Sequence, residues 1–305
     1  MDRGRQVAAG LVLLVAGSCL ASGVIQDVPL SAAQAGMGEV SLLAGGPLAG
    51  WCNPALLADQ SGPRVVEAGG AELLGSGEGY GVIGASWRVS DRVTVGAAAA
   101  SLGASVGELD ADANPTGNTL SHGTLSGGFL GAVAPLRWLE CGLALKGYRD
   151  DLEGVRAQGC TADAGLKLSR LDGAWWGGVA MRNLPVASGG QYGSGPASTP
   201  PVEARAGFGC DVPSLRVRVG VEVVQVRHRD SRTGVGAEWR PWGPLAVRLG
   251  MIDVEVSPRQ LTMGLSFAIH GFDFAYALAT HPLGVSNRVG LSYAFGNPNP
   301  PDRAP

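Results

Sequence analysis

The sequence predicts an all-β fold, an antiparallel transmembrane β-barrel of about 14 strands with an N-terminal luminal plug segment. Three observations predict it: apolar residues alternate with small or polar ones, the number of extended segments is even, and short connections recur at one end of the sheet. Alternation with period two is the pattern of β-strands with one apolar face. An outer-membrane barrel turns that face to lipid and lines its lumen with the other.

Composition supports an exported membrane protein. The 305 residues include 49 glycines and 45% hydrophobic residues but only 16% charged ones, which is few for a soluble protein of this size. The net charge of -3 gives no attraction to polyanions, so we predict no nucleic-acid partner. After the N-terminus no uninterrupted run of about 18 apolar residues occurs, so we expect no transmembrane helix.

The N-terminus has the order of a secretory signal peptide. Charged residues precede an apolar core over residues 7–16, and small residues follow it. We therefore predict a signal peptide over 1–23, with cleavage after Ala21 or Gly23, and a location in the bacterial outer membrane. Lipidation of Cys19 is the alternative.

Residues 61–296 divide into fourteen extended segments, which we predict to be the barrel. The alternation is clearest in LTMGLSFAI from Leu261 and FDFAYALA from Phe272. The predicted strands are 64–74, 79–89, 92–103, 119–134, 137–149, 154–169, 173–184, 201–211, 214–228, 231–240, 244–254, 259–269, 272–281 and 286–296. Because hydrocarbon does not tolerate open sheet edges, we expect the sheet to close on itself.

The connections between these segments alternate in length. Those after even-numbered strands are tight, for example residues 90–91 and 270–271, whereas two after odd-numbered strands are long, 104–118 and 185–200. Short periplasmic turns and longer external loops are typical of outer-membrane barrels. A Greek-key sandwich has no reason to keep this parity.

Charged residues indicate which face meets lipid. On the strongest strands none falls on the apolar face, where arginine at the bilayer midplane costs ~2–4 kcal/mol. We predict that the charges on the other face line the lumen: Glu203, Arg205, Arg216, Arg218, Glu222, Glu238 and Arg248. Aromatic residues near strand ends predict interface girdles: Trp87, Trp138, Tyr148, Trp239, Trp242 and Phe295. A lumen of this size needs filling, and residues 24–60 are the predicted plug.

Residues 30–58 are apolar without period two and carry a resemblance to known families. They contain a Gly-Met-Gly turn and a Trp-x-Asn-Pro-Ala step, and they resemble the N-terminal signature of the PorV/PorQ family and, more distantly, of the fatty-acid transporter FadL. The matching residues are Gly36, Met37, Gly38, Trp51, Asn53, Pro54 and Ala55, with Cys52 inserted before the asparagine. The resemblance extends to the final hairpin, which a Pro-rich tail, 297–305, follows.

The two families imply different functions. Resemblance to PorV/PorQ implies a barrel that docks secreted proteins or secretion-system subunits for type IX secretion. Resemblance to FadL implies passive transport of small hydrophobic compounds, with the plug as a gate. Because most predicted connections are short, the docking role is favoured and transport is the alternative. In either role, outer-membrane lipid and lipopolysaccharide surround the barrel.

Motifs of catalytic or cofactor chemistry are incomplete. Gly79, Gly81 and Gly84 satisfy GxGxxG, but strand residues follow where a dinucleotide site needs a helix N-terminus. Acidic residues in 108–114 lack the turn glycine and the closing glutamate of a calcium loop. His122 beside a serine has no third partner at a recognisable spacing. We predict no enzyme, no cofactor and no metal.

The cysteines allow two interpretations. No cysteine and histidine spacing fits zinc. Cys141 and Cys160 lie on neighbouring predicted strands, so they form a disulfide in an oxidising compartment or serve as small apolar wall residues. The second interpretation is favoured.

Overall fold

The structure is a computed structural model that describes residues 31–73, 78–109, 115–170, 173–187, 200–227, 229–254, 257–282 and 284–296. The predicted signal peptide, Cys19 and the Pro-rich tail lie outside the described residues. No helix of the described part is long and apolar enough to cross a membrane.

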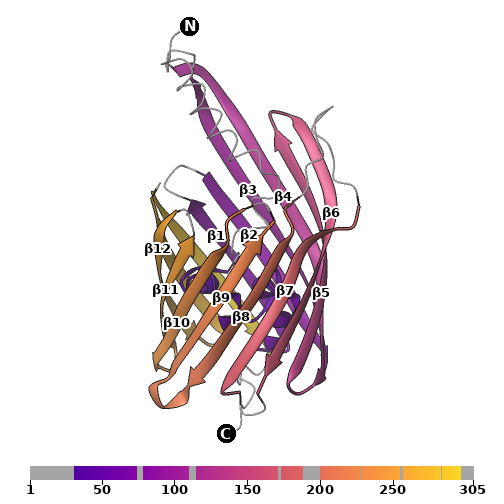
Figure 1. Cartoon of the computed structure of the whole chain (residues 1–305), viewed down its shortest axis with the longest axis vertical. Helices are drawn as coiled ribbons and strands as arrows, with labels where there is room; N and C mark the ends of the chain where they lie inside the picture. The colour runs from indigo at the N-terminus through magenta and orange to yellow at the C-terminus, as the bar shows by residue number, and fades with distance from the viewer. Residues whose placement is uncertain are drawn as a thin grey trace.

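Fourteen antiparallel strands form one closed barrel, in which β1 pairs with β14 and every other strand with its neighbours in sequence (Figure 1). They are β1 Arg64–Leu73, β2 Glu78–Ser90, β3 Val93–Leu109, β4 Pro115–Leu136, β5 Leu139–Leu152, β6 Val155–Ser169, β7 Trp175–Pro185, β8 Glu203–Val212, β9 Val217–Val226, β10 Arg232–Trp242, β11 Leu245–Val254, β12 Ser257–Ile269, β13 Phe272–His281 and β14 Gly284–Phe295. The predicted fold class is confirmed.

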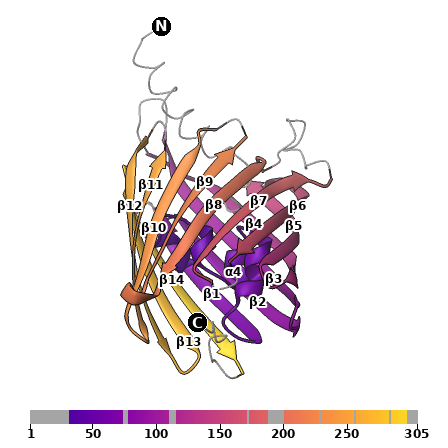
Figure 2. The same ribbon diagram turned by 60° about the horizontal axis from the view of Figure 1, so that its bottom comes forward.

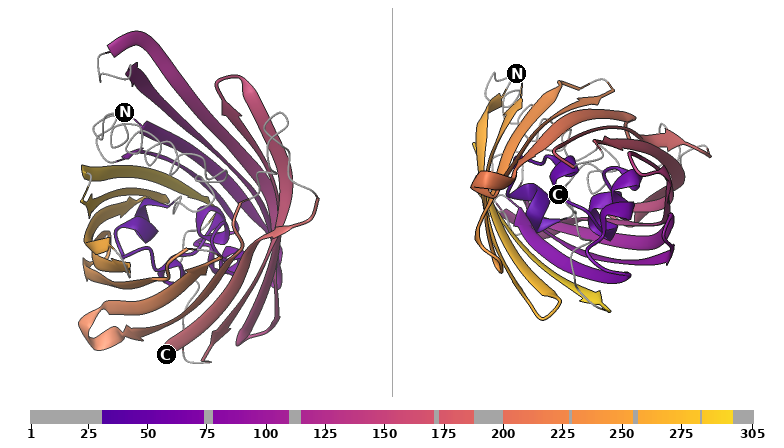
Figure 3. Two further views of the ribbon diagram at one scale, coloured as in Figure 1. Left: turned by 45° about the horizontal axis from the view of Figure 1, so that its top comes forward. Right: turned by 90° about the horizontal axis from the view of Figure 1, so that it is seen from below.

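The long connection predicted at 104–118 is mostly strand. β3 and β4 run on as a hairpin that rises beyond the barrel rim (Figures 1 and 3), with Ala104 opposite His122 and Gly107 opposite Thr119. Glycine, proline, aspartate and asparagine are depleted in strands, and residues 104–118 contain all four, which is why the sequence indicated a loop. Hydrogen bonds between the two paired strands stabilise the extended conformation despite this low strand propensity.

The two faces of the wall differ as the alternation predicts. On the outside, Phe129 is 76% exposed and Leu249 is 58% exposed, whereas the inward-facing Arg248 is 3% exposed. The exposed tryptophans near the tight turns form a girdle at that end. Tyr148 is an exception, because it faces inward and packs over Gly159, where no side chain occupies the space.

The possible disulfide between Cys141 and Cys160 is not formed, and both thiols are free. In the ladder between β5 and β6, Cys141 lies opposite Leu166 and Cys160 lies opposite Gly147. Six residues of β-strand separate the two pairs, a distance of about 20 Å at ~3.3 Å per residue. A disulfide cannot span that distance.

Residues 31–60, here called the N-terminal segment, lie inside the barrel (Figures 2 and 3). The segment forms four short helices: α3 Ala32–Ala35, η1 Ser41–Leu43, α4 Pro47–Gly50 and η2 Pro54–Asp59. Between them, α3 contacts β12–β14, η1 contacts β8 and β9, α4 contacts β1–β3, and η2 contacts β3–β6. Leu42 reaches β7 at Gly178, and residues 37–38 reach β10 and β11, so the segment meets every strand.

Glycines on the luminal face let the segment approach the wall closely. A Cβ atom added at Gly36 of α3's C-terminal end would lie 2.9 Å from Gly264 Cα on β12, and one added at Gly142 or Gly234 would overlap backbone atoms of the segment. Many of the 49 glycines therefore serve as contact points for the segment.

Candidate functional site

The candidate site is the buried polar contact between the N-terminal segment and the barrel wall. At its centre lies the carboxylate of Glu203 on β8, which is fully buried. Arg182 Nη1 of β7 lies 2.7 Å from Glu203 Oε1, and Arg205 Nε of β8 pairs with the same oxygen. Arg232 Nη2 of β10 lies 3.7 Å from the other oxygen. Three guanidinium groups therefore converge on one carboxylate.

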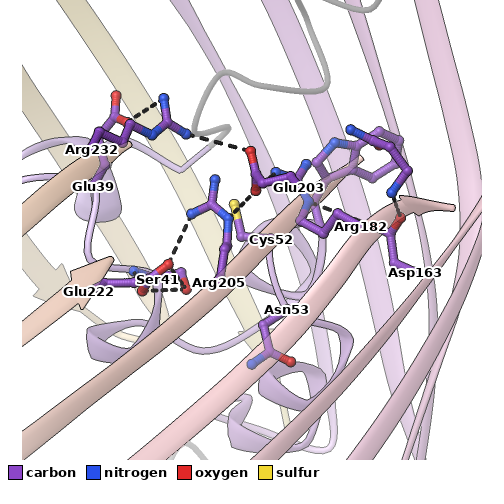
Figure 4. Close-up of polar contacts among 12 residues, drawn as sticks. Glu39, Ser41, Cys52, Asn53, Asp163, Arg182, Glu203, Arg205, Glu222 and Arg232 are labelled. Atoms are coloured by element: carbon purple, nitrogen blue, oxygen red, sulfur yellow. Dashed lines mark hydrogen bonds and ion pairs between the residues drawn. The ribbon is translucent and has the colours of Figure 1, made fainter. Parts of the chain in front are cut away.

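The pairing continues in both directions around the wall (Figure 4). Towards β5, Arg182 Nε lies 3.8 Å from Asp163 Oδ2, and Asp163 pairs with Lys146. Towards β9, Arg205 Nη1 lies 3.0 Å from Glu222 Oε1. We call this chain the luminal charge belt, defined by Lys146, Asp163, Arg182, Glu203, Arg205 and Glu222. It crosses five consecutive strands, β5 to β9.

The charge belt holds the N-terminal segment at two points. At one end, Ser41 donates to the carboxylate of Glu222 from its backbone nitrogen at 2.7 Å and from its hydroxyl at 2.8 Å. At the other end, Lys146 Nζ donates to Trp51 O at 2.8 Å and lies 4.2 Å from the centre of the Trp51 ring. Because charged donors and acceptors make the stronger hydrogen bonds, these contacts fix η1 and the end of α4 on the wall.

A third polar contact comes from Glu39, which follows the Gly-Met-Gly turn. Its carboxylate lies 3.4 Å from Arg232 Nη1 and 3.9 Å from Arg288 Nη1 of β14. Gly38 and Glu39 both have positive φ, 64° and 61°, a conformation that glycine adopts freely and other residues rarely adopt. Gly38 N also donates to Thr262 Oγ1 at 2.9 Å. The turn thereby presents Glu39 to both arginines.

Two further contacts lie outside the belt. Lys167 Nζ lies 2.5 Å from Asp59 Oδ2 at the end of η2, and Leu48 N donates to Glu67 Oε2 at 2.9 Å. Removing one partner of a buried ion pair leaves an uncompensated charge and costs ~3–5 kcal/mol. These contacts hold the segment on the wall, and the described cysteines are all free, so no disulfide among them joins the segment to it.

The predicted luminal charges are distributed among several groups. Glu203, Arg205 and Glu222 belong to the charge belt. Glu238 Oε2 pairs with Arg248 Nε at 2.8 Å, and Arg218 Nε lies 2.9 Å from Asp211 Oδ1. In both of these pairs the two partners belong to the wall.

Arg216 was predicted on the luminal face of a strand and lies elsewhere. The short helix η3, Pro213–Leu215, ends at Arg216, whose φ of 53° places it in the left-handed region, so β9 begins only at Val217. Its side chain is exposed and donates from Nη1 to Pro241 O at 2.9 Å. Proline at 213 starts a turn that alternation alone does not reveal.

Three members of the charge belt were not predicted: Lys146, Asp163 and Arg182. Their strands contain many small residues, which weaken the alternation. The scarcity of lysine could have indicated these luminal positions, because the chain has only two lysines, Lys146 and Lys167. Both are buried and face the lumen.

The motif residues lie in two groups. Gly36, Met37 and Gly38 approach β10–β12, with Met37 fully buried. Trp51, Asn53, Pro54 and Ala55 approach β5 and β6, where Asn53 Oδ1 accepts from Ala55 N at 3.1 Å and so caps η2. Among the described residues, no group of three His, Cys, Asp or Glu side chains is arranged to hold a metal ion.

The barrel resembles several solved structures. The Ralstonia pickettii toluene transporter TbuX superposes with a TM-score of 0.67 at 15% identity, over 88% of this chain and 98% of that one. The P. putida toluene transporter TodX gives 0.68 at 12% identity, over 87% and 98%. A Pseudomonas aeruginosa FadL homologue gives 0.63 at 12% identity, over 88% and 99%.

The chain has a FadL-like barrel fold. No family model and no curated protein matches the sequence. These three structures are two toluene transporters and a FadL homologue, and none of them is a PorV or PorQ protein, so the resemblance to PorV/PorQ stays a prediction.

Proposed function

We propose that this FadL-like barrel lies in the bacterial outer membrane and lets small hydrophobic compounds diffuse across it, with the N-terminal segment as a movable plug. The observation that supports this most is the segment itself, which meets every strand and is held by non-covalent polar contacts. A barrel that needed only a filled core has no reason to fill it with charged contacts. The similarity to toluene transporters supports the same function.

The wall beside the segment suits an apolar compound. Tyr80, Val82, Ala98, Ala100 and Leu102 of β2 and β3 form one buried apolar cluster with Leu48 and Trp51 of the segment. A hydrophobic compound gains by leaving water for such a surface, whereas a sugar loses its hydration there. Movement of the N-terminal segment away from the wall would open a path between the two surfaces.

Cells with an intact outer membrane provide the test. The lipopolysaccharide leaflet slows the hydrophobic probe N-phenyl-1-naphthylamine, so we expect expression of the protein to speed the rise in its fluorescence. Deleting residues 31–58 should also give ion conductance in planar bilayers, which the intact protein should lack. Equal probe uptake with and without the protein would reject the proposal.

A docking role in protein secretion is the second candidate. The hairpin of β3 and β4 extends beyond the rim (Figure 1) and offers a surface that transport does not need. If docking is the function, affinity-tagged protein should co-purify a secreted protein or a secretion subunit, and deleting the tip of the hairpin should abolish this. Normal secretion in cells without the barrel would reject this role.

A further inference from the structure

A groove runs along the lipid-facing side of β1 to β4. Two hollows of about 890 Å³ and 640 Å³ adjoin there. Both are lined by Val66, Ala85, Ala97 and Phe129, so they form one continuous depression. It begins at the tight-turn end of the barrel, beside Arg64, and extends up the wall.

The groove exists because small residues meet across three strands. Ala85 lies opposite Ala97, and Ile83 lies opposite Ala99, while Ala99 lies opposite Gly127 on β4. Phe129, beside them, is 76% exposed and forms a wall. The outward positions of β12, by contrast, carry large side chains: Leu261, Met263, Leu265 and Phe267.

A positive charge stands where the groove begins. The guanidinium carbon of Arg64 lies 5.3 Å from the centre of the Trp87 ring, and both side chains are exposed. The described residues give Arg64 no ion pair. Because exposed tryptophans concentrate at the depth of the lipid head groups, Arg64 lies at that depth.

The whole tight-turn end is positively charged and rich in tryptophan. Exposed arginines come from six places around it: Arg64, Arg92, Arg137, Arg170, Arg216 and Arg240. Among the described residues, Asp91 is the one exposed carboxylate there. The exposed tryptophans lie at the same end: Trp87, Trp138, Trp175, Trp239 and Trp242. Arginine beside interfacial tryptophan favours anionic lipid, at ~1 kcal/mol per charge near such a surface.

We propose that this groove binds one anionic phospholipid, with an acyl chain over Ala85, Ala97 and Ala99 and the phosphate on Arg64. The apolar floor fits a hydrocarbon chain, and the charge at its end fits a phosphate. A soluble acidic protein would not reach the floor, because the groove lies on the face that meets lipid. The site concerns the outside of the wall and is independent of what crosses the lumen.

Native mass spectrometry of the full chain in mild detergent tests this, with dioleoyl phosphatidylglycerol and dioleoyl phosphatidylethanolamine as probes. We expect one phosphatidylglycerol to stay bound in preference to phosphatidylethanolamine. Arg64→Gln should weaken this binding about tenfold, because a charged hydrogen bond is lost. Ala97→Phe, or the milder Ala97→Leu, should remove it by filling the groove.

Matched controls separate the groove from the general surface. Arg137→Gln removes another arginine at the same end, and Val223→Phe adds a ring to the lipid-facing side of β9, so both should bind as the unmodified chain does. Equal retention of the two lipids would overturn the proposal. So would an unchanged phosphatidylglycerol adduct in Ala97→Leu, or a loss in Arg137→Gln as large as in Arg64→Gln.

Discussion

Glu222 joins the charge belt to the N-terminal segment, because its carboxylate accepts from both the backbone and the hydroxyl of Ser41 and also pairs with Arg205. Glu222→Ala removes all these contacts. Charged hydrogen bonds contribute ~1.5–3 kcal/mol each, so we expect the segment to detach at least about tenfold more often. The labelling rate of Cys52, which is 1% exposed in the segment, measures this in a variant without other cysteines.

Glu238→Ala is the matched control for this substitution. Glu238 is equally buried and charged, but its partners are Arg240 and Arg248 of the wall. We expect it to lower barrel stability without speeding the labelling of Cys52. An equal acceleration in both variants would mean that Glu222 stabilises the barrel in general and does not hold the segment.

Glycine positions give a second prediction at this scale. A Cβ atom at Gly250 would lie 2.5 Å from Met37 C, whereas one at Gly131 would meet nothing within 4 Å. Gly250→Ala should therefore displace the segment and cost ~1–3 kcal/mol. Gly131→Ala should stay within about 0.5 kcal/mol. Urea unfolding followed by tryptophan fluorescence measures both, and equal midpoints would contradict the close approach.

Among the elements, the hairpin of β3 and β4 separates barrel stability from surface function. Beyond Ala104 and Ser121, these strands pair with each other and not with β2 or β5. Replacing residues 105–121 by an Asn-Gly turn, which would join the opposite residues Ala104 and His122, should leave the barrel folded and probe uptake unchanged. The unboiled band in SDS gel electrophoresis reports the fold. Loss of that band would show that the hairpin supports the barrel.

Most strands could be predicted because the alternation of apolar with small or polar residues lies within each strand's own sequence. From Leu261 to Ile269, apolar residues alternate with small or polar ones, and the tight turn at 270–271 marks the end of the strand. The charge belt could not be predicted, because Lys146 and Asp163 meet only after β5 and β6 pair in register. The short helices of the N-terminal segment could not be predicted from the sequence either, because contacts with the surrounding wall determine their conformation.

At the scale of the whole molecule, the number of strands determines the width of the lumen. A lumen of this width conducts water unless something fills it. Barrels of this size lie between those packed with side chains and open water channels. Here one segment of the same chain fills the space and contacts the entire wall. We therefore propose that passage through the barrel requires this segment to move.

A reversible tether tests that claim most directly. Val40 Cγ1 lies 3.2 Å from a Cβ built at Gly220, a spacing that suits a disulfide between Val40→Cys and Gly220→Cys in a variant without other cysteines. We predict that the oxidised tether stops uptake of N-phenyl-1-naphthylamine and that reduction restores it, while each single variant transports throughout. Undiminished uptake by the fully oxidised protein would contradict the account.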